Sequence, residues 1–267
     1  MGLGAARLAA DEDLRDGVSA LGWRVTNEEI APAEGSDAEI RRTIDLVRRL
    51  SAQVSSATAD RAFPLVLAGN CNSSLGTVAG CGDDELGVVW FDAHADFDDP
   101  AENTSGFFDV MSLAMLTGRG WDALRATIPG HSPIPETNVV LAGVRDMEPY
   151  QRRTLEASDL IVVPGAFDAA AFESALRELR SRVSCVYLHV DVDVLDVAEA
   201  QANEYAAPGG PSLDRLLRCL RLVGERFAVV AAAITAYDPA FDPDDRTLFA
   251  ARRIAAEIAA SAHHRDH

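Results

Sequence analysis

One stretch of the chain decides the fold: Leu86-Gly87-Val88-Val89-Trp90-Phe91-Asp92-Ala93-His94-Ala95-Asp96. Its first part is short, apolar and rich in branched or aromatic residues, which is typical of a strand buried on both faces. Such a strand does not end in carboxylates without a reason, because burying a charge is costly. Residues two apart in an extended chain point the same way, so Asp92, His94 and Asp96 can converge. The stretch predicts a buried strand that ends in a metal site.

A second stretch repeats this pattern later in the chain. The apolar run Cys185-Val186-Tyr187-Leu188-His189-Val190 is followed by Asp191-Val192-Asp193. Clustered aspartates would repel one another unless divalent cations offset their charge. Carboxylate and imidazole ligands favour hard to borderline ions, and a carboxylate-rich pair site suits manganese better than zinc. The alternative is a set of solvated loop residues in a chain with 42 Asp and Glu, but two independent clusters argue against it.

Three motifs resemble those of the ureohydrolase superfamily, which comprises arginase, agmatinase and formiminoglutamase. The DAHxD motif is present as Asp92 to Asp96, SxDxDxxDP as His189 to Asp196, and an altered GGDHS as Ala68 to Asn72. The resemblance covers most of the chain. It implies a single arginase-like domain over residues 1–267, with a disordered tail at 262–267. The implied fold is three-layer α/β/α with a doubly wound, mainly parallel sheet. Residues 1–8 resemble the family's first helix without the strand that precedes it, so either the given sequence begins after that strand or the strand has been lost.

The resemblance also implies a binuclear manganese centre. One metal would be held by Cys71, Asp92, Asp96 and Asp191, and the other by Asp92, His94, Asp191 and Asp193. Cys71 stands where the family has histidine, and its softer thiolate makes Zn2+ or Fe2+ more favourable. The same replacement resembles hydroxyarginine hydrolases of antibiotic pathways. The alternative for Cys71 is a small buried thiol after a strand.

Such a centre performs hydrolysis. Two divalent ions that share a water lower its pKa, and the resulting hydroxide can attack a guanidinium, amidine or amide carbon. Asp109 falls where arginases have a proton-shuttling histidine, so Asp109 and His94 are the predicted catalytic residues. An aspartate near two cations stays ionised, which makes it a better base than acid.

Substrate recognition departs from the family pattern. Ala236 replaces the family's guanidinium-binding glutamate, so ordinary arginase activity is not expected. The predicted substrate contacts come from three loops instead and are Asn103, Ser105, Asp146, Glu148 and Glu204. The alternatives are that Asp146 pairs with Arg145 and that Glu204 is only solvated.

Composition favours a cytoplasmic enzyme that acts on a small molecule. The formal net charge of −18 argues against nucleic acid and anionic membranes as partners. The four cysteines fit a reduced compartment, and the sequence contains neither a signal peptide nor a membrane span. Oligomers are usual in the resembled family, so a homo-oligomer is expected.

Periodicity predicts alternating strands and helices, with the motifs at the carboxyl edge of a parallel sheet. Strands are expected at residues 23–26, 64–68, 86–91, 138–142, 160–163, 185–190 and 228–234. Helices are expected at residues 37–57, 110–116, 150–157, 169–181, 213–226 and 246–260.

Three functions fit these features. The first is a metal-dependent hydrolase of C–N bonds in a linear amidine, guanidino or hydroxyguanidino compound. The second is a catalytically degenerate protein of the same fold that still binds metal. The third is a single-metal amide hydrolase that resembles the deacetylases sharing this fold.

Overall fold

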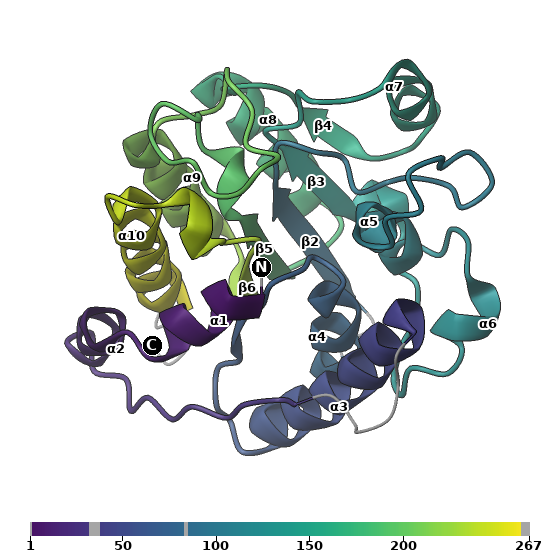
Figure 1. Ribbon diagram of the computed structural model, residues 1–267. Helices are drawn as coiled ribbons and strands as arrows, with labels where there is room; N and C mark the ends of the chain where they lie inside the picture. Colours follow the sequence, from purple (N-terminus) through teal and green to yellow (C-terminus); the bar gives the residue numbers. More distant parts are fainter. Residues whose placement is uncertain (1, 32–37, 83–84, 263–267) are drawn as a thin grey trace.

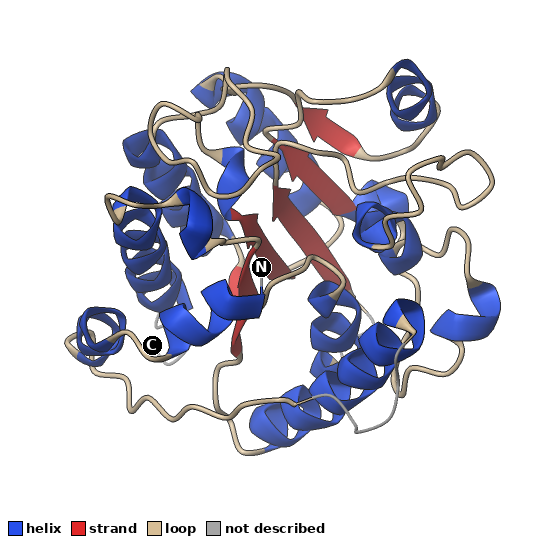
Figure 2. Ribbon diagram, viewed as in Figure 1, coloured by secondary structure: helices blue, strands red, loops and turns tan. Residues whose placement is uncertain are grey.

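A single sheet of six parallel strands, in the order β1-β6-β5-β2-β3-β4, forms the centre of the computed structural model (Figure 2). The structure describes residues 2–31, 38–82 and 85–262. Its strands are β1 (Leu65–Leu67), β2 (Leu86–Phe91), β3 (Val139–Ala142), β4 (Ile161–Val163), β5 (Cys185–Asp191) and β6 (Ala228–Thr235). The predicted parallel sheet is confirmed, and every strand pair of this sheet is parallel.

Helices cover both faces of the sheet and complete three layers, as predicted (Figure 1). One face carries α3 (Glu39–Ala59), α4 (Ser73–Cys81) and α5 (Ser112–Leu116), and the other carries α8 (Ala169–Arg180), α9 (Leu213–Arg226) and α10 (Arg246–Ala262). The remaining described helices are α1 (Gly2–Ala9), α2 (Glu12–Ser19), α6 (Asp122–Arg125) and α7 (Pro149–Glu156). None of the helices in the described ranges has both the length and the apolar character that a membrane crossing needs.

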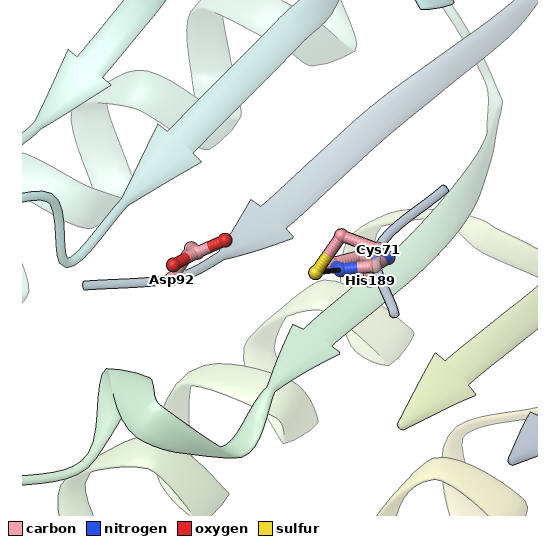
Figure 3. Close-up of side chains that lie close together, drawn as sticks. All are labelled: Cys71, Asp92 and His189. Carbon is pink, nitrogen blue, oxygen red and sulfur yellow. Dashed lines mark hydrogen bonds between the residues drawn. The ribbon is translucent and has the colours of Figure 1, made fainter. Parts of the chain in front are cut away.

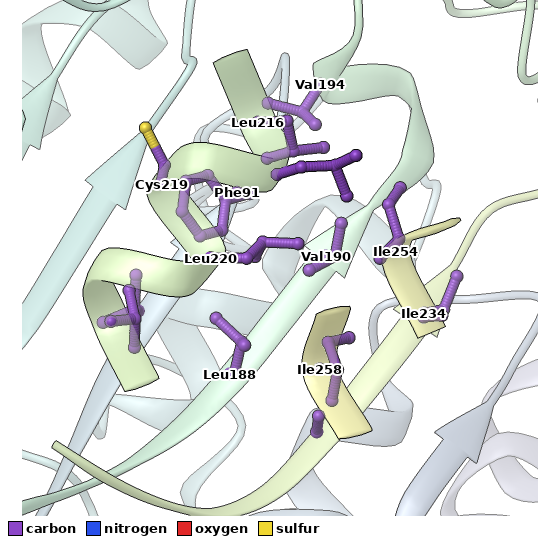
Figure 4. Close-up of a cluster of buried hydrophobic side chains, with 14 of the residues drawn as sticks. Phe91, Leu188, Val190, Val194, Leu216, Cys219, Leu220, Ile234, Ile254 and Ile258 are labelled. Atoms are coloured by element: carbon purple, nitrogen blue, oxygen red, sulfur yellow. The ribbon is translucent and has the colours of Figure 1, made fainter. Parts of the chain in front are cut away.

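The core lies in two layers because alternate residues of each central strand point to opposite faces. On β2, Trp90 packs under α4 and α5, whereas Phe91 packs on the opposite side with Val190 of β5. Figure 4 shows this second layer, in which Leu220 of α9 and Ile258 of α10 close over the strands. Burial on both faces explains why β2 and β5 are continuous apolar runs.

Six of the seven predicted strands are confirmed, with small shifts at their ends. The prediction of a strand at residues 23–26 is wrong, since this segment is not assigned to the sheet. Its apolar residues Trp23 and Val25 rest on the edge of the core, and the Trp23 indole donates to the carbonyl of Ala259. Side-chain packing against α10, and not strand pairing, accounts for the apolar alternation.

Sequence periodicity missed helix α4, which carries the residues after Cys71. Its sequence SSLGTVAGC is rich in small residues with low helix propensity. The structure shows their use: a Cβ at Gly76 would lie 2.5 Å from the carbonyl oxygen of Val47, so glycine lets α4 approach α3 closely. Residues 263–267 of the predicted tail lie outside the described residues, and Ala262 ends α10.

Candidate metal centre

The acidic clusters lie at the carboxyl ends of the neighbouring strands β2 and β5. These strands pair in parallel, with Phe91 opposite Val190, so Asp92 and Asp191 follow at the same edge. The Asp191 carboxylate accepts the amide of Asp193, and the Asp92 carboxylate accepts the amide of His94 at 2.7 Å. These short turns direct several side chains to one place. The predicted convergence of the two motifs is therefore present.

An outer set of donors consists of Asp92, His94 and Asp193. The Nδ1 atom of His94 lies 3.3 Å from Asp92 Oδ1 and 3.4 Å from Asp193 Oδ2. One ligand atom from each residue lies within 4.8 Å of the other two. The His94 side chain is 27% exposed, whereas both carboxylates are buried. This set opens toward solvent and has the spacing that a cation needs.

An inner set of donors consists of Cys71, Asp92 and His189, and all three are buried. The Cys71 Sγ atom lies 3.3 Å from His189 Nε2, and Figure 3 shows the thiol and the imidazole facing each other. Ligand atoms of this set also lie within 4.8 Å of one another. Because Asp92 belongs to both sets, its carboxylate stands between two potential cation positions.

The other two predicted metal ligands lie close to these sets. Asp191 Oδ2 accepts a hydrogen bond from the Cys71 thiol at 3.1 Å. Asp96 is buried and adopts a positive φ of 48°, which is costly for a residue with a side chain. Burial, followed by the charge of Asp92, raises the pKa of Asp96. Strain of this kind is often found at functional sites.

The electrostatics indicate that the centre lacks positive charge. Burial, followed by the charge of Asp193, raises the pKa of Asp92 to about 6. Burial and neighbouring carboxylates also raise the pKa values of Asp96 and Asp191 well above the usual range. Burial opposes a charge on His94, but hydrogen bonds to Asp193 and Asp92 outweigh it and raise its pKa to about 12. A divalent cation would relieve this repulsion.

Asp109 has a clear structural role beside the inner set. Its carboxylate accepts the backbone amides of Cys71 and Asn72, at 3.1 and 2.8 Å, and the side-chain amides of Asn70 and Asn72. Ser112 donates a further hydrogen bond. Burial raises the pKa of Asp109 in spite of these bonds. Asp109 thus holds the turn that presents Cys71, and its proton-transfer role stays a prediction.

The loop after β2 is organised by Asp98, which accepts hydrogen bonds from Asn103, Tyr150 and Gln151. Asn103 in turn accepts the hydroxyl of Ser105 and the amide of Gly106. Asn103 and Ser105 therefore stabilise each other within an exposed loop. Their contact with substrate stays a prediction.

The acidic residues predicted at the rim lie in different settings. Asp146 is 63% exposed, and its Oδ2 atom lies 3.9 Å from His94 Nε2. Glu148 precedes α7 and forms a capping box with Gln151. Glu204 is exposed and next to Tyr205, whose pKa rises through burial and then through the charge of Glu204.

Within the part of the chain that the structure describes, the Arg145 side chain does not hydrogen-bond the Asp146 carboxylate. Its guanidinium donates instead to backbone carbonyls around the site, those of Gly143, Asp193, Val194, Leu195, Ala207 and Pro208. One cation therefore joins the turn after β5 to the loop that follows it. Gly143 lies at the same junction, where a Cβ would be 2.8 Å from the carbonyl oxygen of Asp92.

Three site residues escaped sequence analysis. His189 was assigned to a core strand, and its place at the end of that strand, two residues before an aspartate of the motif, was the available signal. Asn203 donates to Asp193 at 3.2 Å and to the carbonyl of Ala236. The Tyr205 ring stacks on Phe107 and meets the edge of His94. No periodicity marks Asn203 or Tyr205, because both lie in an irregular loop.

The replacement of the family's glutamate by Ala236 leaves an apolar, buried position directly after β6. Ala236 has a φ of 62° and a carbonyl that accepts from Asn203. The backbone at Ala236 is thus left-handed, a conformation that is costly for a residue with a Cβ. Fold and site together define an α/β protein in which carboxylates and imidazoles that could hold a metal ion lie together at the carboxyl edge of the sheet.

Comparison with known proteins identifies the family. The profile of the Arginase family matches residues 6–260. An arginase of Staphylococcus aureus (strain MRSA252) is 29% identical over 212 residues, covering 76% of this chain and 70% of that protein. The crystal structure of an arginase from Bacillus subtilis subsp. subtilis str. 168 has a TM-score of 0.84 at 26% identity, covering 98% of this chain and 91% of the other. Agmatine ureohydrolase of Thermoplasma volcanium shares the fold, with a TM-score of 0.64 at 19% identity and coverages of 94% and 83%.

This chain belongs to the arginase family. The predicted membership of the ureohydrolase superfamily is confirmed, and with it the prediction of an enzyme that hydrolyses C–N bonds. The family generally binds a metal, typically Mn2+, and the two donor sets are where a metal would bind in this chain.

Proposed function

We propose that this protein hydrolyses a C–N bond of a linear amidine, guanidino or hydroxyguanidino compound at a pair of divalent cations. The observation that carries the proposal is that Asp92 is shared by two donor sets, Cys71–Asp92–His189 and Asp92–His94–Asp193. A carboxylate between two adjacent sets is the arrangement that bridges a metal pair. The raised pKa values of Asp92, Asp96 and Asp191 support it, since these groups lack the positive charge that the metals would provide.

The donors fit divalent cations, and when bound these would lower the pKa of a water molecule and supply hydroxide near neutral pH. The protein residues hold and orient this centre. Asn203 donates to Asp193 and fixes the carboxylate that faces His94. Asp146 faces Nε2 of His94, so the ring presents Nδ1 to Asp92 and Asp193. At 3.9 Å Asp146 is an acidic neighbour of the outer nitrogen and not a direct hydrogen-bond partner, and its charge favours the tautomer with the proton on Nε2.

The rim of the site suits a planar cation. The Tyr205 and Phe107 rings stack with centroids 6.0 Å apart, and the Tyr205 ring lies 6.5 Å from that of His94. Aromatic faces attract guanidinium and amidinium groups, and a nearby carboxylate such as Glu204 or Asp146 adds to the attraction. These groups take over from the glutamate that Ala236 replaces. We therefore infer that the substrate is bound at the aromatic rim and not by a buried carboxylate below it.

One observation favours a second function. The outer set of Asp92, His94 and Asp193 alone provides an Asp, His, Asp shell for one metal, as the single-metal amide hydrolase hypothesis requires. In that case the hydrogen bond from the Cys71 thiol to Asp191 and the contact between Cys71 Sγ and His189 Nε2 would take the place of the second cation. Metal stoichiometry separates the two functions.

The test combines metal counting with a substrate panel. After loading with a mixture of Mn2+ and Zn2+ and desalting, we expect two metal equivalents per chain in total, and release of ammonia or urea from amidines, guanidines or hydroxyguanidines. Asp193→Asn should abolish turnover, whereas Asp214→Asn, on the exposed face of α9, should leave it unchanged. One equivalent with release of carboxylate from N-acyl amides would support the single-metal hydrolase. Bound metal without turnover of any compound would indicate a catalytically degenerate protein, and the proposal would be wrong.

The expected homo-oligomer stays a prediction, as do the cytoplasmic location and the number of metals.

A further inference from the structure

The inner donor set contains the imidazole of His189, which is not among the metal ligands predicted from the sequence. Of those predicted ligands, Cys71 stands where the family has histidine, and no other nitrogen ligand is predicted at the inner position. His189, however, points from β5 directly at the sulfur, with Nε2 3.3 Å from Sγ (Figure 3). It stands at the first position of the SxDxDxxDP motif, where the pattern has serine. The chain thus lacks an imidazole at residue 71 but has one at residue 189, and this imidazole faces the Cys71 sulfur.

We propose that His189 is a metal ligand and that, with Cys71 and Asp92, it forms a sulfur–nitrogen–oxygen site for a borderline cation such as Zn2+ or Co2+. Asp191, which touches the sulfur, is the next oxygen available to this cation. The outer set, built from carboxylates and one imidazole, suits Mn2+. The centre is therefore a site for two different metals. This inference rests on the metal centre of the proposed function and names the chemistry of one half of it.

Neighbouring side chains hold the imidazole in one orientation. The Trp90 indole stacks on it with ring centroids 3.6 Å apart and an angle of 14° between the planes. Trp90 and His189 are opposite each other in the β2–β5 register, and both side chains are fully buried. The ring cannot turn without displacing the indole, so Nε2 stays directed at Cys71. Trp90 also donates to Asp92 at 3.0 Å and positions the third ligand.

The Nδ1 side of the His189 ring has a partner for the tautomer that a metal requires. Nδ1 lies 2.9 Å from the hydroxyl oxygen of Tyr187. When the ring donates its Nδ1 proton to this oxygen, Nε2 presents a free lone pair toward Cys71. Metal-binding histidines characteristically donate the other ring N–H to such a partner.

The donor types decide which cation this site takes. A thiolate and an imidazole favour zinc and cobalt, while manganese prefers oxygen. Thr235 lies beside both donors, with Oγ1 3.3 Å from the sulfur and 3.3 Å from Nε2. The same hydroxyl lies 3.4 Å from Asp191 Oδ2, so in the metal-bound state it can donate to the thiolate or to this carboxylate. Such a contact would stabilise the charged sulfur in a buried position.

Cobalt titration of the metal-free protein tests the proposal, because optical spectra report the ligands directly. The wild type should show a thiolate-to-cobalt charge-transfer band together with the d–d bands of the metal. Cys71→Ser should remove the charge-transfer band. His189→Asn, which keeps a polar group beside Tyr187, should shift the d–d bands and weaken cobalt binding more than 100-fold. Tyr187→Phe leaves the ligands in place and should weaken binding by about 10–100-fold, as outer-shell changes do.

Two controls separate a ligand from a structural residue. His131→Asn removes a half-buried imidazole outside both donor sets and should leave the spectrum and affinity unchanged. Asp193→Asn disables the outer set and should keep the charge-transfer band. If His189→Asn folds and binds cobalt with the wild-type spectrum and affinity, His189 is not a ligand and the proposal is wrong. If that variant does not fold, unchanged binding in Tyr187→Phe would overturn it.

The spectra also keep this inference apart from the proposed function. A protein that gives the expected bands but hydrolyses no substrate would retain the inference and refute the function. A protein that hydrolyses amidines while His189→Asn binds cobalt normally would do the reverse.

Discussion

Replacement of Asp109 by alanine distinguishes a structural role for this carboxylate from proton transfer. The side chain accepts two buried backbone amides, those of Cys71 and Asn72, and three further donors. Side-chain donors can rotate toward other partners, but the two amides stay in the turn before α4. An orphaned buried amide costs about 1–3 kcal/mol. We therefore expect Asp109→Ala to lower the free energy of unfolding by about 2–6 kcal/mol.

Urea denaturation followed by circular dichroism measures this change, with thermal unfolding as a second observable. In a domain of this size each kcal/mol corresponds to about 2–4 °C in Tm, so the midpoint should fall by about 4–24 °C. Asp16→Ala, on the exposed surface of α2, is the matched control and should alter stability by less than about 0.5 kcal/mol. A variant that loses turnover but keeps wild-type stability would refute the structural reasoning and support proton transfer by Asp109.

Four further perturbations of the site have expected outcomes. Saturation with manganese at 100 times Kd should stabilise the protein by about 2.7 kcal/mol, or about 5–11 °C in Tm. Without metal, the raised pKa of Asp92, about 6, contributes stability that is fully present below its unfolded value and lost as pH rises through 6. The raised pKa of His94 acts in the same direction, because the stability that it contributes is lost as pH rises above 6.5. The Tm of the metal-free protein, measured in a buffer series, should therefore fall between pH 5 and pH 8. An unchanged or rising Tm would contradict this. Tyr205→Ala should raise KM for a cationic substrate about 5- to 30-fold in steady-state assays, because it removes a cation–π contact. Tyr205→Phe keeps the ring and should leave KM unchanged. Equal effects of the two substitutions would argue against the aromatic contact. Arg145→Lys should lower the free energy of unfolding by about 3 kcal/mol, because an ammonium cannot hydrogen-bond all the carbonyls that the guanidinium reaches. If the variant unfolds at the same urea concentration as the wild type, Arg145 does not stabilise these loops.

The sequence by itself determined the sheet and the position of the site. Apolar runs that end in DxHxD and DxD predict two buried strands with acidic carboxyl ends, and parallel pairing then brings those ends together. This inference holds because strand periodicity and burial are local properties. The prediction of a strand at residues 23–26 is wrong for the same reason. Local alternation cannot reveal that Trp23 packs on α10 and that its segment does not pair with a strand of the sheet.

Only the tertiary structure decided which side chains meet. His189 reads as one more residue of a core strand, and its approach to Cys71 depends on how β5 lies beside the loop after β1. Asp109 is read from the chain as a reacting group, yet the fold surrounds it with backbone amides. Contacts between residues far apart in sequence depend on helix and loop packing, which no local pattern encodes. The chemistry at Asp92 is therefore predictable from sequence, whereas the ligands that complete it are set by the three-dimensional arrangement.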